Sequence, residues 1–239
     1  MRRWRHRTNR PNPSRGRIAA LALLAAASVV SPASVAAQGL ERTKADLDRE
    51  VIEQAAASRA RGQQGAPVLV YEIADFQCPY CARFSTEVFP RLDSAFVQSG
   101  QVQWVFVNLP LPTLHPRAWA AAEAALCAGG VGDGFWPFHD RLFSSQREWS
   151  DADDPHEVFL RYAEEADLPL PAFEDCLLGD RVASVLLEDI VFAASARVSG
   201  TPTFVIDNSQ VVVGLKSYEE WEALLQEALR KKNGAPRRP

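Results

Sequence analysis

A pair of cysteines between a strand-like run and a helical run constrains this chain more than any other feature. Residues Pro67–Ile73 form a β-rich apolar run, and Cys78-Pro79-Tyr80-Cys81 follows after four further residues. Because proline suits the first position of a helix, we expect a helix to begin at this pair. Two cysteines three residues apart on a first helical turn lie close enough to form a disulfide. The sequence therefore predicts a buried strand that leads into a dithiol at a helix N-terminus.

The helix N-terminus makes Cys78 the expected nucleophile. Unpaired backbone N–H groups and the helix dipole favour a thiolate there, which lowers the pKa of Cys78. Cys81 lies further inside the helix, and we expect it to stay protonated and to act as the resolving thiol. A zinc site and an inert structural disulfide are the alternatives. Cys127 and Cys176 each stand alone, without the second close pair that a zinc ribbon requires. A redox dithiol without metal or organic cofactor is therefore the preferred hypothesis.

The remaining sequence patterns predict an α/β fold. A strand at Val102–Val107 follows the dithiol helix, which implies a parallel β-α-β unit with a right-handed crossover. An amphipathic helix at Glu41–Arg61 precedes this unit. The later helices and the strand hairpin are expected at Ala118–Ala128, Phe135–Phe143, Pro155–Ala166, Pro171–Leu178, Arg181–Val198, Thr203–Ile206, Val211–Val213 and Ser217–Arg230. This order predicts a mixed central sheet with helices on both faces and an inserted helical block.

The first 37 residues have the order of a secretory signal. Seven arginines and no acidic residue precede the apolar run Ile18–Val30, and small residues follow at Val35-Ala36-Ala37. This run of 13 residues is shorter than the roughly 20 that span a bilayer. Residues 1–37 are therefore predicted to be a signal peptide, and an uncleaved anchor is the alternative. Export places the cysteines in an oxidising compartment, the periplasm or another extracytoplasmic space.

Charge and composition define the expected partners and domains. The whole chain has a net charge of −4, and the part after residue 37 has 19 cationic and 30 acidic residues, a net charge of −11. Such an acidic protein is a poor candidate for nucleic-acid binding.

We expect a helical extension at 38–66, a main domain at 67–232 with a helical insertion at about 116–180, and a flexible tail at 233–239. The protein is expected to be a monomer.

Three motifs together resemble the DsbA-like branch of the thioredoxin superfamily. They span roughly Val68 to Leu229 and are the segment Tyr71–Cys81, the pair His115-Pro116 before the alanine-rich helix with Cys127, and the segment Gly200-Thr201-Pro202-Thr203-Phe204. The resemblance implies a thioredoxin fold with an inserted helical block. It also implies thiol–disulfide exchange at Cys78 and Cys81, with sulfur alone carrying the electrons.

The resemblance assigns substrate-binding roles to residues around the dithiol. It implies that the Thr201–Pro202 peptide bond is cis and lies beside the cysteines, where the Thr201 backbone can pair with an extended substrate. An ordinary trans turn proline is the alternative. Pro79 and Tyr80, between the cysteines, are further expected substrate contacts. Phe76, next to the turn, is expected to be an exposed apolar contact.

Glu72 is expected to transfer protons. Strand alternation places Glu72 on the same face as Val68 and Val70, which favours burial over a solvent-facing position. A buried carboxyl has a raised pKa and can exchange protons near neutral pH. In the resembled family an acidic residue at this place assists the inner thiol, which is Cys81 here.

The resemblance also implies a structural disulfide between Cys127 and Cys176 in the helical block, with two separate buried thiols as the alternative.

Tyr80 replaces the histidine of strongly oxidising relatives and adds no positive charge, which predicts a milder oxidant. The direction of electron flow stays open. The chain is either an oxidase of reduced exported proteins that a quinone-linked membrane partner reoxidises, or a reductase or isomerase kept reduced by a membrane donor. A non-catalytic peptide-binding module is the third hypothesis.

Overall fold

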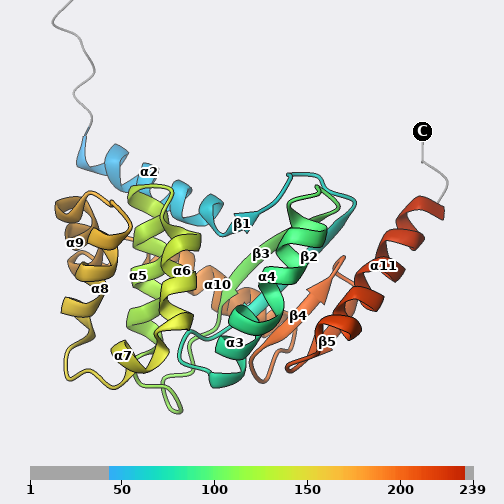
Figure 1. The fold of residues 1–239 in the computed structure, drawn as a ribbon. Helices are drawn as coiled ribbons and strands as arrows, with labels where there is room; N and C mark the ends of the chain where they lie inside the picture. Colours follow the sequence, from blue (N-terminus) through green and yellow to red (C-terminus); the bar gives the residue numbers. More distant parts are fainter. Residues whose placement is uncertain (1–42, 235–239) are drawn as a thin grey trace, which may run out of the picture. The chain divides into compact units, whose positions relative to one another are not determined.

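A five-stranded sheet with the strand order β1-β3-β2-β4-β5 lies at the centre of the fold. The computed structural model describes residues 43–234 (Figure 1). β2 (Val68–Ala74) and β3 (Val102–Asn108) pair in parallel, and β4 (Thr203–Ile206) runs antiparallel to β2. β5 (Gln210–Val213) pairs antiparallel with β4 at one edge. This arrangement confirms the predicted mixed sheet. The predicted signal peptide, residues 38–42 and residues 235–239 lie outside the described part.

The segment before β2 differs from the predicted single helix. α2 (Lys44–Ser58) ends before Arg61, and β1 (Ala60–Arg61) pairs antiparallel with β3 at the other edge of the sheet. Gly62 follows with a φ of +91°, and a Cβ at this position would lie 2.7 Å from the Val102 carbonyl oxygen. Glycine therefore permits the tight turn from β1 toward β2. A strand of two residues carries no periodicity, so the sequence pattern could not separate it from the helix.

The helix after the dithiol is continuous but changes its hydrogen-bond pattern along its length. It consists of α3 (Pro79–Arg83), the π-helical turn η1 (Phe84–Val88), α4 (Phe89–Leu92) and a second π-helical turn, η2 (Asp93–Val97). At the end of η1 the backbone N–H of Phe89 donates to the carbonyl of Phe84. Pro90 comes next and has no N–H to donate. The wider π turn therefore lies where the regular pattern of helical hydrogen bonds loses a backbone N–H donor.

Helices cover both faces of the sheet (Figure 1). The α3-to-η2 helix and α11 (Tyr218–Gly234) pack on one face, where the core is rich in aromatic side chains. Among these are Phe84, Phe89, Trp104, Phe204 and Trp221. α10 (Ala183–Ser195) covers the opposite face, where it packs against Ile73, Val107 and Val205 of the strands. Burial on both faces explains why the two central strands are almost continuous apolar runs.

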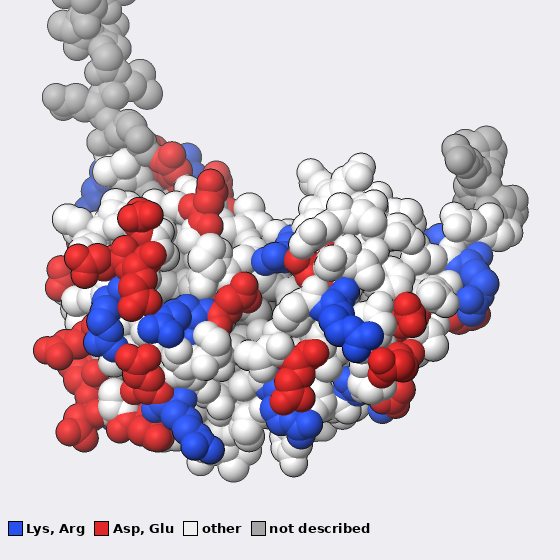
Figure 2. Space-filling view, viewed as in Figure 1, with Lys and Arg blue, Asp and Glu red and all other residues white. Residues whose placement is uncertain are grey.

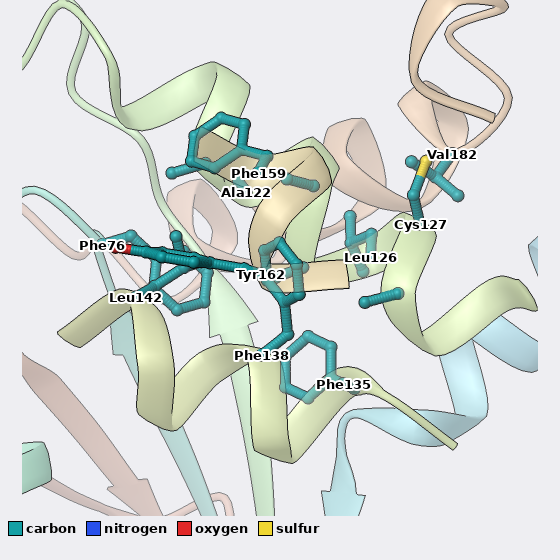
Figure 3. Packing of buried hydrophobic residues seen from close by; sticks show 14 of the residues in the cluster. Phe76, Ala122, Leu126, Cys127, Phe135, Phe138, Leu142, Phe159, Tyr162 and Val182 are labelled. Carbon is teal, nitrogen blue, oxygen red and sulfur yellow. The ribbon is translucent and has the colours of Figure 1, made fainter. Parts of the chain in front are cut away.

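Five helices between β3 and α10 form a second core beside the sheet. They are α5 (Ala118–Val131), α6 (Phe135–Ser144), α7 (Gln146–Ser150), α8 (Pro155–Glu165) and α9 (Leu170–Leu178). Figure 3 shows Phe138 of α6 next to Tyr162 of α8, with Phe135 nearby in this core. Cys127 of α5 and Cys176 of α9 are joined by a disulfide with a Cα–Cα distance of 5.8 Å. The helices occupy the expected region of the insertion, although α7 was not expected. The proposed domain boundaries stay predictions.

Within residues 43–234, no helix has both the length and the apolar character required to cross a bilayer.

Candidate active site

The dithiol lies where β2 ends and α3 begins. Cys78 is the N-cap residue of α3, and its carbonyl accepts a hydrogen bond from the Ala82 backbone N–H at 3.1 Å. The Cys78 side chain is 5% exposed, while Cys81 is fully buried. The sulfur of Cys78 lies 3.5 Å from the carbonyl oxygen of Thr201, and the Thr201–Pro202 peptide bond is cis. The fold therefore brings Thr201 and Pro202, from the loop before β4, to the outer thiol.

The two thiols have pKa shifts of opposite sign. The Cys81 thiol lowers the pKa of Cys78 from 9.0 to about 5 through a hydrogen bond, and burial opposes this effect. Thr201 and the backbone N–H groups of Cys81 and Tyr80 add further hydrogen bonds that lower the same pKa. Burial raises the pKa of Cys81 well above its usual range, and the charge on Cys78 adds to that increase. At neutral pH the outer sulfur is therefore an anion, while the inner sulfur keeps its proton.

Glu72 on β2 is buried in the aromatic core of the sheet. Its Oε2 accepts a hydrogen bond from the Trp104 indole N–H at 2.8 Å, while Oε1 has no hydrogen-bond partner in the described protein. Burial raises the pKa of Glu72 to about 8, the Trp104 bond lowers it, and the charge of Asp140 raises it. Glu72 also interacts electrostatically with Cys81. A neutral carboxyl in this position can give up or take a proton near physiological pH.

The residues expected to contact substrate divide into two groups. Pro79 and Tyr80 are exposed, and the Tyr80 side chain is 57% accessible to solvent. The prediction for Phe76 is wrong, because its side chain is only 1% exposed. The ring points into the core, with its centroid 5.0 Å from that of Phe106 and 4.9 Å from that of Phe143 (Figure 3). Burying a phenyl ring in this core stabilises the fold by about 2 kcal/mol.

Asp75 holds the turn before Cys78 in place through hydrogen bonds. The sequence pattern did not predict this role. One carboxylate oxygen of Asp75 accepts from the Gln77 backbone N–H at 2.7 Å. The other accepts from the Leu111 backbone N–H at 2.9 Å and lies 2.9 Å from Nδ1 of His115. The Asp75 backbone also forms a hydrogen bond with Cys81. The buried carboxylate therefore connects the dithiol turn to the loop after β3, which contains the His115-Pro116 motif.

Gln146 on α7 is a second positioning residue that sequence reasoning missed. Its side-chain amide donates to the carbonyl oxygens of Phe76, at 2.8 Å, and Cys78, at 3.0 Å. These bonds connect the helical insertion to the active-site turn. No local signal could have indicated this role, because 68 residues separate Gln146 from Cys78 in the chain.

The described residues contain no group of three or more His, Cys, Asp or Glu side chains that could hold a metal ion.

Comparisons with known proteins agree with this geometry. Residues 54–227 match the family described as Thioredoxin. The chain is 38% identical to "Na(+)/H(+) antiporter NhaA 3" of Salinispora tropica, over 76% of this chain and 26% of that protein. It is 26% identical to "Disulfide bond formation protein D" of Bacillus subtilis, over 72% of this chain and 77% of that protein. The chain thus spans only about a quarter of the length of the antiporter relative.

Solved structures share the fold. Oxidised BdbD from Bacillus subtilis superposes with a TM-score of 0.65 at 24% identity, covering 72% of this chain and 92% of that one. Alpha-DsbA1 from Wolbachia pipientis gives a TM-score of 0.64 at 22% identity, covering 73% and 92%. The family match covers most of the chain, and each of these solved structures is covered over 92% of its length. The chain therefore belongs to the thioredoxin family and has the fold of its DsbA-like members.

Proposed function

We propose that this chain is an exported protein thiol–disulfide oxidoreductase that forms disulfides in other proteins at Cys78 and Cys81. The observation that carries the proposal is the acidity of the outer thiol. The pKa of Cys78 is about 5, while burial holds the proton on Cys81. Because a stabilised thiolate favours the reduced enzyme, the disulfide form is a good oxidant of other thiols.

The reaction consists of two exchange steps. A substrate thiolate attacks the Cys78 sulfur of the enzyme disulfide, and Cys81 leaves and takes a proton from Glu72. The second substrate thiol, as a thiolate, then attacks the sulfur that is bonded to Cys78. Cys78 leaves as a thiolate, the substrate is oxidised to a disulfide, and its two electrons stay on the enzyme sulfurs. In this proposal the backbone of Thr201, whose carbonyl oxygen lies 3.5 Å from the Cys78 sulfur, pairs with the substrate backbone, and the exposed Pro79 and Tyr80 contact the substrate next to the attacked sulfur.

The proposed substrates are unfolded or reduced exported proteins, and the proposed enzyme is a monomer. A quinone-linked membrane partner would reoxidise the dithiol outside the cytoplasm. The signal-like residues 1–37 support export. The relatives named disulfide bond formation protein D support this activity, and the match covers 77% of the Bacillus subtilis protein. Ion transport is not part of this proposal, because the chain matches only about a quarter of the antiporter relative.

A reductase or isomerase is the second candidate, and Tyr80 favours it. Its exposed phenol adds no positive charge to stabilise the Cys78 thiolate. The redox potential separates the two candidates. If the chain is an oxidase, the redox potential of its Cys78–Cys81 pair should lie between the values of about −270 mV for thioredoxin and about −120 mV for DsbA. Equilibration with glutathione would measure this potential. A value at or below that of thioredoxin would assign the reductase.

Activity assays test the proposal directly. The oxidised full-length protein should oxidise reduced ribonuclease and restore its activity, and Cys78→Ala should abolish this reaction. Glu87→Ala, an exposed change on the same helix, serves as the matched control. If Cys78→Ala supported refolding as well as the wild type, the chain would be a non-catalytic binding module.

A further inference from the structure

Another buried titratable side chain, His139 on α6, has no part in the exchange steps above. It is completely buried, and its Nδ1 lies 2.8 Å from a carboxylate oxygen of Asp140. Burial lowers the pKa of His139, so the imidazole is neutral at physiological pH. Because an ionised carboxylate can only accept hydrogen bonds, Nδ1 carries the ring proton and Nε2 is an acceptor. In the described protein this buried Nε2 has no hydrogen-bond partner.

Glu72 and His139 border the same part of the aromatic core. Phe106 is the register partner of Glu72 on the neighbouring strand, so the two side chains lie on one face of the sheet. The Phe106 ring centroid is 5.0 Å from the imidazole centroid of His139. Asp140 influences the ionisation of both groups. Two buried polar atoms without a hydrogen-bond partner among the described residues, Oε1 of Glu72 and Nε2 of His139, therefore belong to side chains that both neighbour Phe106.

Asp140 connects this buried region to solvent. Its side chain is 59% exposed and lines a groove of about 630 Å³ between α6 and the helix that follows the dithiol. Ser85, Arg61 and Ser144 also line this groove. Figure 2 shows the molecule from the side on which α6 and α4 lie in Figure 1. Because His139 contacts Asp140 through one nitrogen, its other nitrogen is free to accept a proton from inside the core.

We propose that His139 and Asp140 carry the proton of Glu72 between the buried dithiol and this groove, an inference that rests on the proposed exchange reaction. When Cys81 attacks a mixed disulfide, the neutral Glu72 passes its own proton to Nε2 of His139, through one water or a change of its own rotamer, and takes the proton of the Cys81 thiol in its place. The Nδ1 proton moves to Asp140 and from there to solvent, which leaves the ring proton on Nε2, and the next inward transfer restores the starting tautomer. Only S–H, O–H and N–H bonds change, and the electrons stay on the sulfurs.

The same route runs inward when Cys81 leaves the enzyme disulfide. Glu72 gives its proton to Cys81 and is left as a buried carboxylate, which is costly in an apolar core. A proton from the groove, delivered through Asp140 and His139, returns it to the neutral form. The other charged groups that act on these residues are Arg61, whose charge lowers the pKa of His139, and Cys81, which interacts electrostatically with Glu72.

Two variants and a packing control test this route in the full-length protein. His139→Phe keeps an aromatic ring in the core and removes both nitrogens, while Asp140→Asn changes an exposed side chain. Phe143→Leu is the control, because Phe143 packs on His139 at a centroid distance of 4.9 Å but cannot carry a proton. Stopped-flow fluorescence would follow reduction by dithiothreitol and reoxidation by oxidised glutathione over a range of pH, in water and in heavy water. Glutathione equilibria would give the redox potential of each variant.

We expect His139→Phe to slow both reactions about tenfold or more at neutral pH, with an unchanged redox potential and a larger solvent isotope effect. Asp140→Asn should slow them in the same direction, and Phe143→Leu should not. Wild-type rates in both His139→Phe and Asp140→Asn would overturn the proposal, as would equal slowing by Phe143→Leu. If His139→Phe does not fold, Asp140→Asn decides the question. Failure of the wild type to oxidise reduced ribonuclease would count against the proposed function and not against the proton route.

Discussion

At the scale of single residues, Glu72 links proton transfer to the stability of the fold. Its pKa is raised from 4.5 to about 8, so folding favours the protonated form. The stabilisation is complete below about pH 4.5 and is lost as the pH rises through about 8. The shift corresponds to a loss of up to about 5 kcal/mol in the free energy of unfolding. Glu72→Gln cannot ionise, so we expect its unfolding free energy to depend less on pH than that of the wild type.

Urea denaturation at about pH 5, 7 and 9 would measure this difference. Both proteins should be fully oxidised in this measurement. In the reduced protein the lowered pKa of Cys78 stabilises the fold increasingly as the pH rises from about 5 to 9, which is opposite to the effect of Glu72. Glu87→Gln, at an exposed position, is the matched control and should follow the wild type. Parallel stability curves for the wild type and Glu72→Gln would show that Glu72 does not titrate in this range.

At the scale of elements, the short helix α7 of the inserted block holds the turn that contains the outer thiol. Gln146 holds the carbonyls of Phe76 and Cys78, on either side of Gln77. In Gln146→Ala the turn loses both bonds, so the backbone N–H groups of α3 should point less well at the sulfur. We expect the pKa of Cys78 to rise and the free energy of unfolding to fall by about 1 to 2 kcal/mol.

The ultraviolet absorbance of the thiolate as a function of pH would measure the pKa of Cys78 in Gln146→Ala, and urea denaturation would measure its stability. Arg147→Ala changes the next, exposed residue of α7 and should leave both quantities unchanged. A pKa that stayed at the wild-type value in Gln146→Ala would limit this residue to a structural role.

A buried ion pair connects the N-terminal extension to the sheet and to α10. Asp189 on α10 pairs with Arg59, and it accepts hydrogen bonds from the backbone and side chain of Asn108, at 2.9 and 2.7 Å. Asp189→Ala would leave the Arg59 guanidinium, which is only 12% exposed, without its counter-charge. Breaking a buried pair in this way costs about 3 to 5 kcal/mol. Thermal or urea unfolding should show a loss of this size, whereas Glu188→Ala, at an exposed position of α10, should be close to neutral; a small loss for Asp189→Ala would contradict the prediction.

Sequence patterns predicted the elements that follow a regular periodicity. β2, β3, the β4–β5 hairpin and α11 were confirmed, because alternating or helical apolar patterns determine which side chains are buried. Glu72 was correctly expected to be buried on the same grounds. β1 and α7 were missed, because two and five residues are too few to show a period.

The errors at the candidate site have a common physical cause. Phe76 was expected to be exposed because it lies next to the active-site turn, yet the inserted helices provide an apolar core into which its ring packs. Gln146 and the pair of His139 and Asp140 act on the site from the same helices. Gln146 contacts Phe76 across 70 residues of chain, and Asp140 acts electrostatically on the distant Glu72, so both effects are set by tertiary packing. Local patterns do not encode such packing.

At the scale of the whole molecule, the two cysteine pairs have separate tasks. Cys78 and Cys81 are free thiols at the end of a strand, whereas Cys127 and Cys176 form a disulfide that closes a loop with a sequence separation of 49. In the chain-entropy description a crosslink over such a loop stabilises a protein by about 4 kcal/mol. Because it joins α5 to α9 inside the helical block, it acts on the insertion rather than on the reacting sulfurs.

The double variant Cys127→Ala/Cys176→Ala tests this separation of tasks. Removing the crosslink returns entropy to the unfolded chain, so urea denaturation should show a loss of about 4 kcal/mol. The redox potential of Cys78 and Cys81 should stay at the wild-type value, because neither cysteine of the second pair is among the groups that shift the pKa of Cys78 or Cys81. Cys78→Ala/Cys81→Ala is the reciprocal control and should lose exchange while keeping the second disulfide. A changed potential in the first double variant would show that the helical block transmits strain to the dithiol through α7 and Gln146.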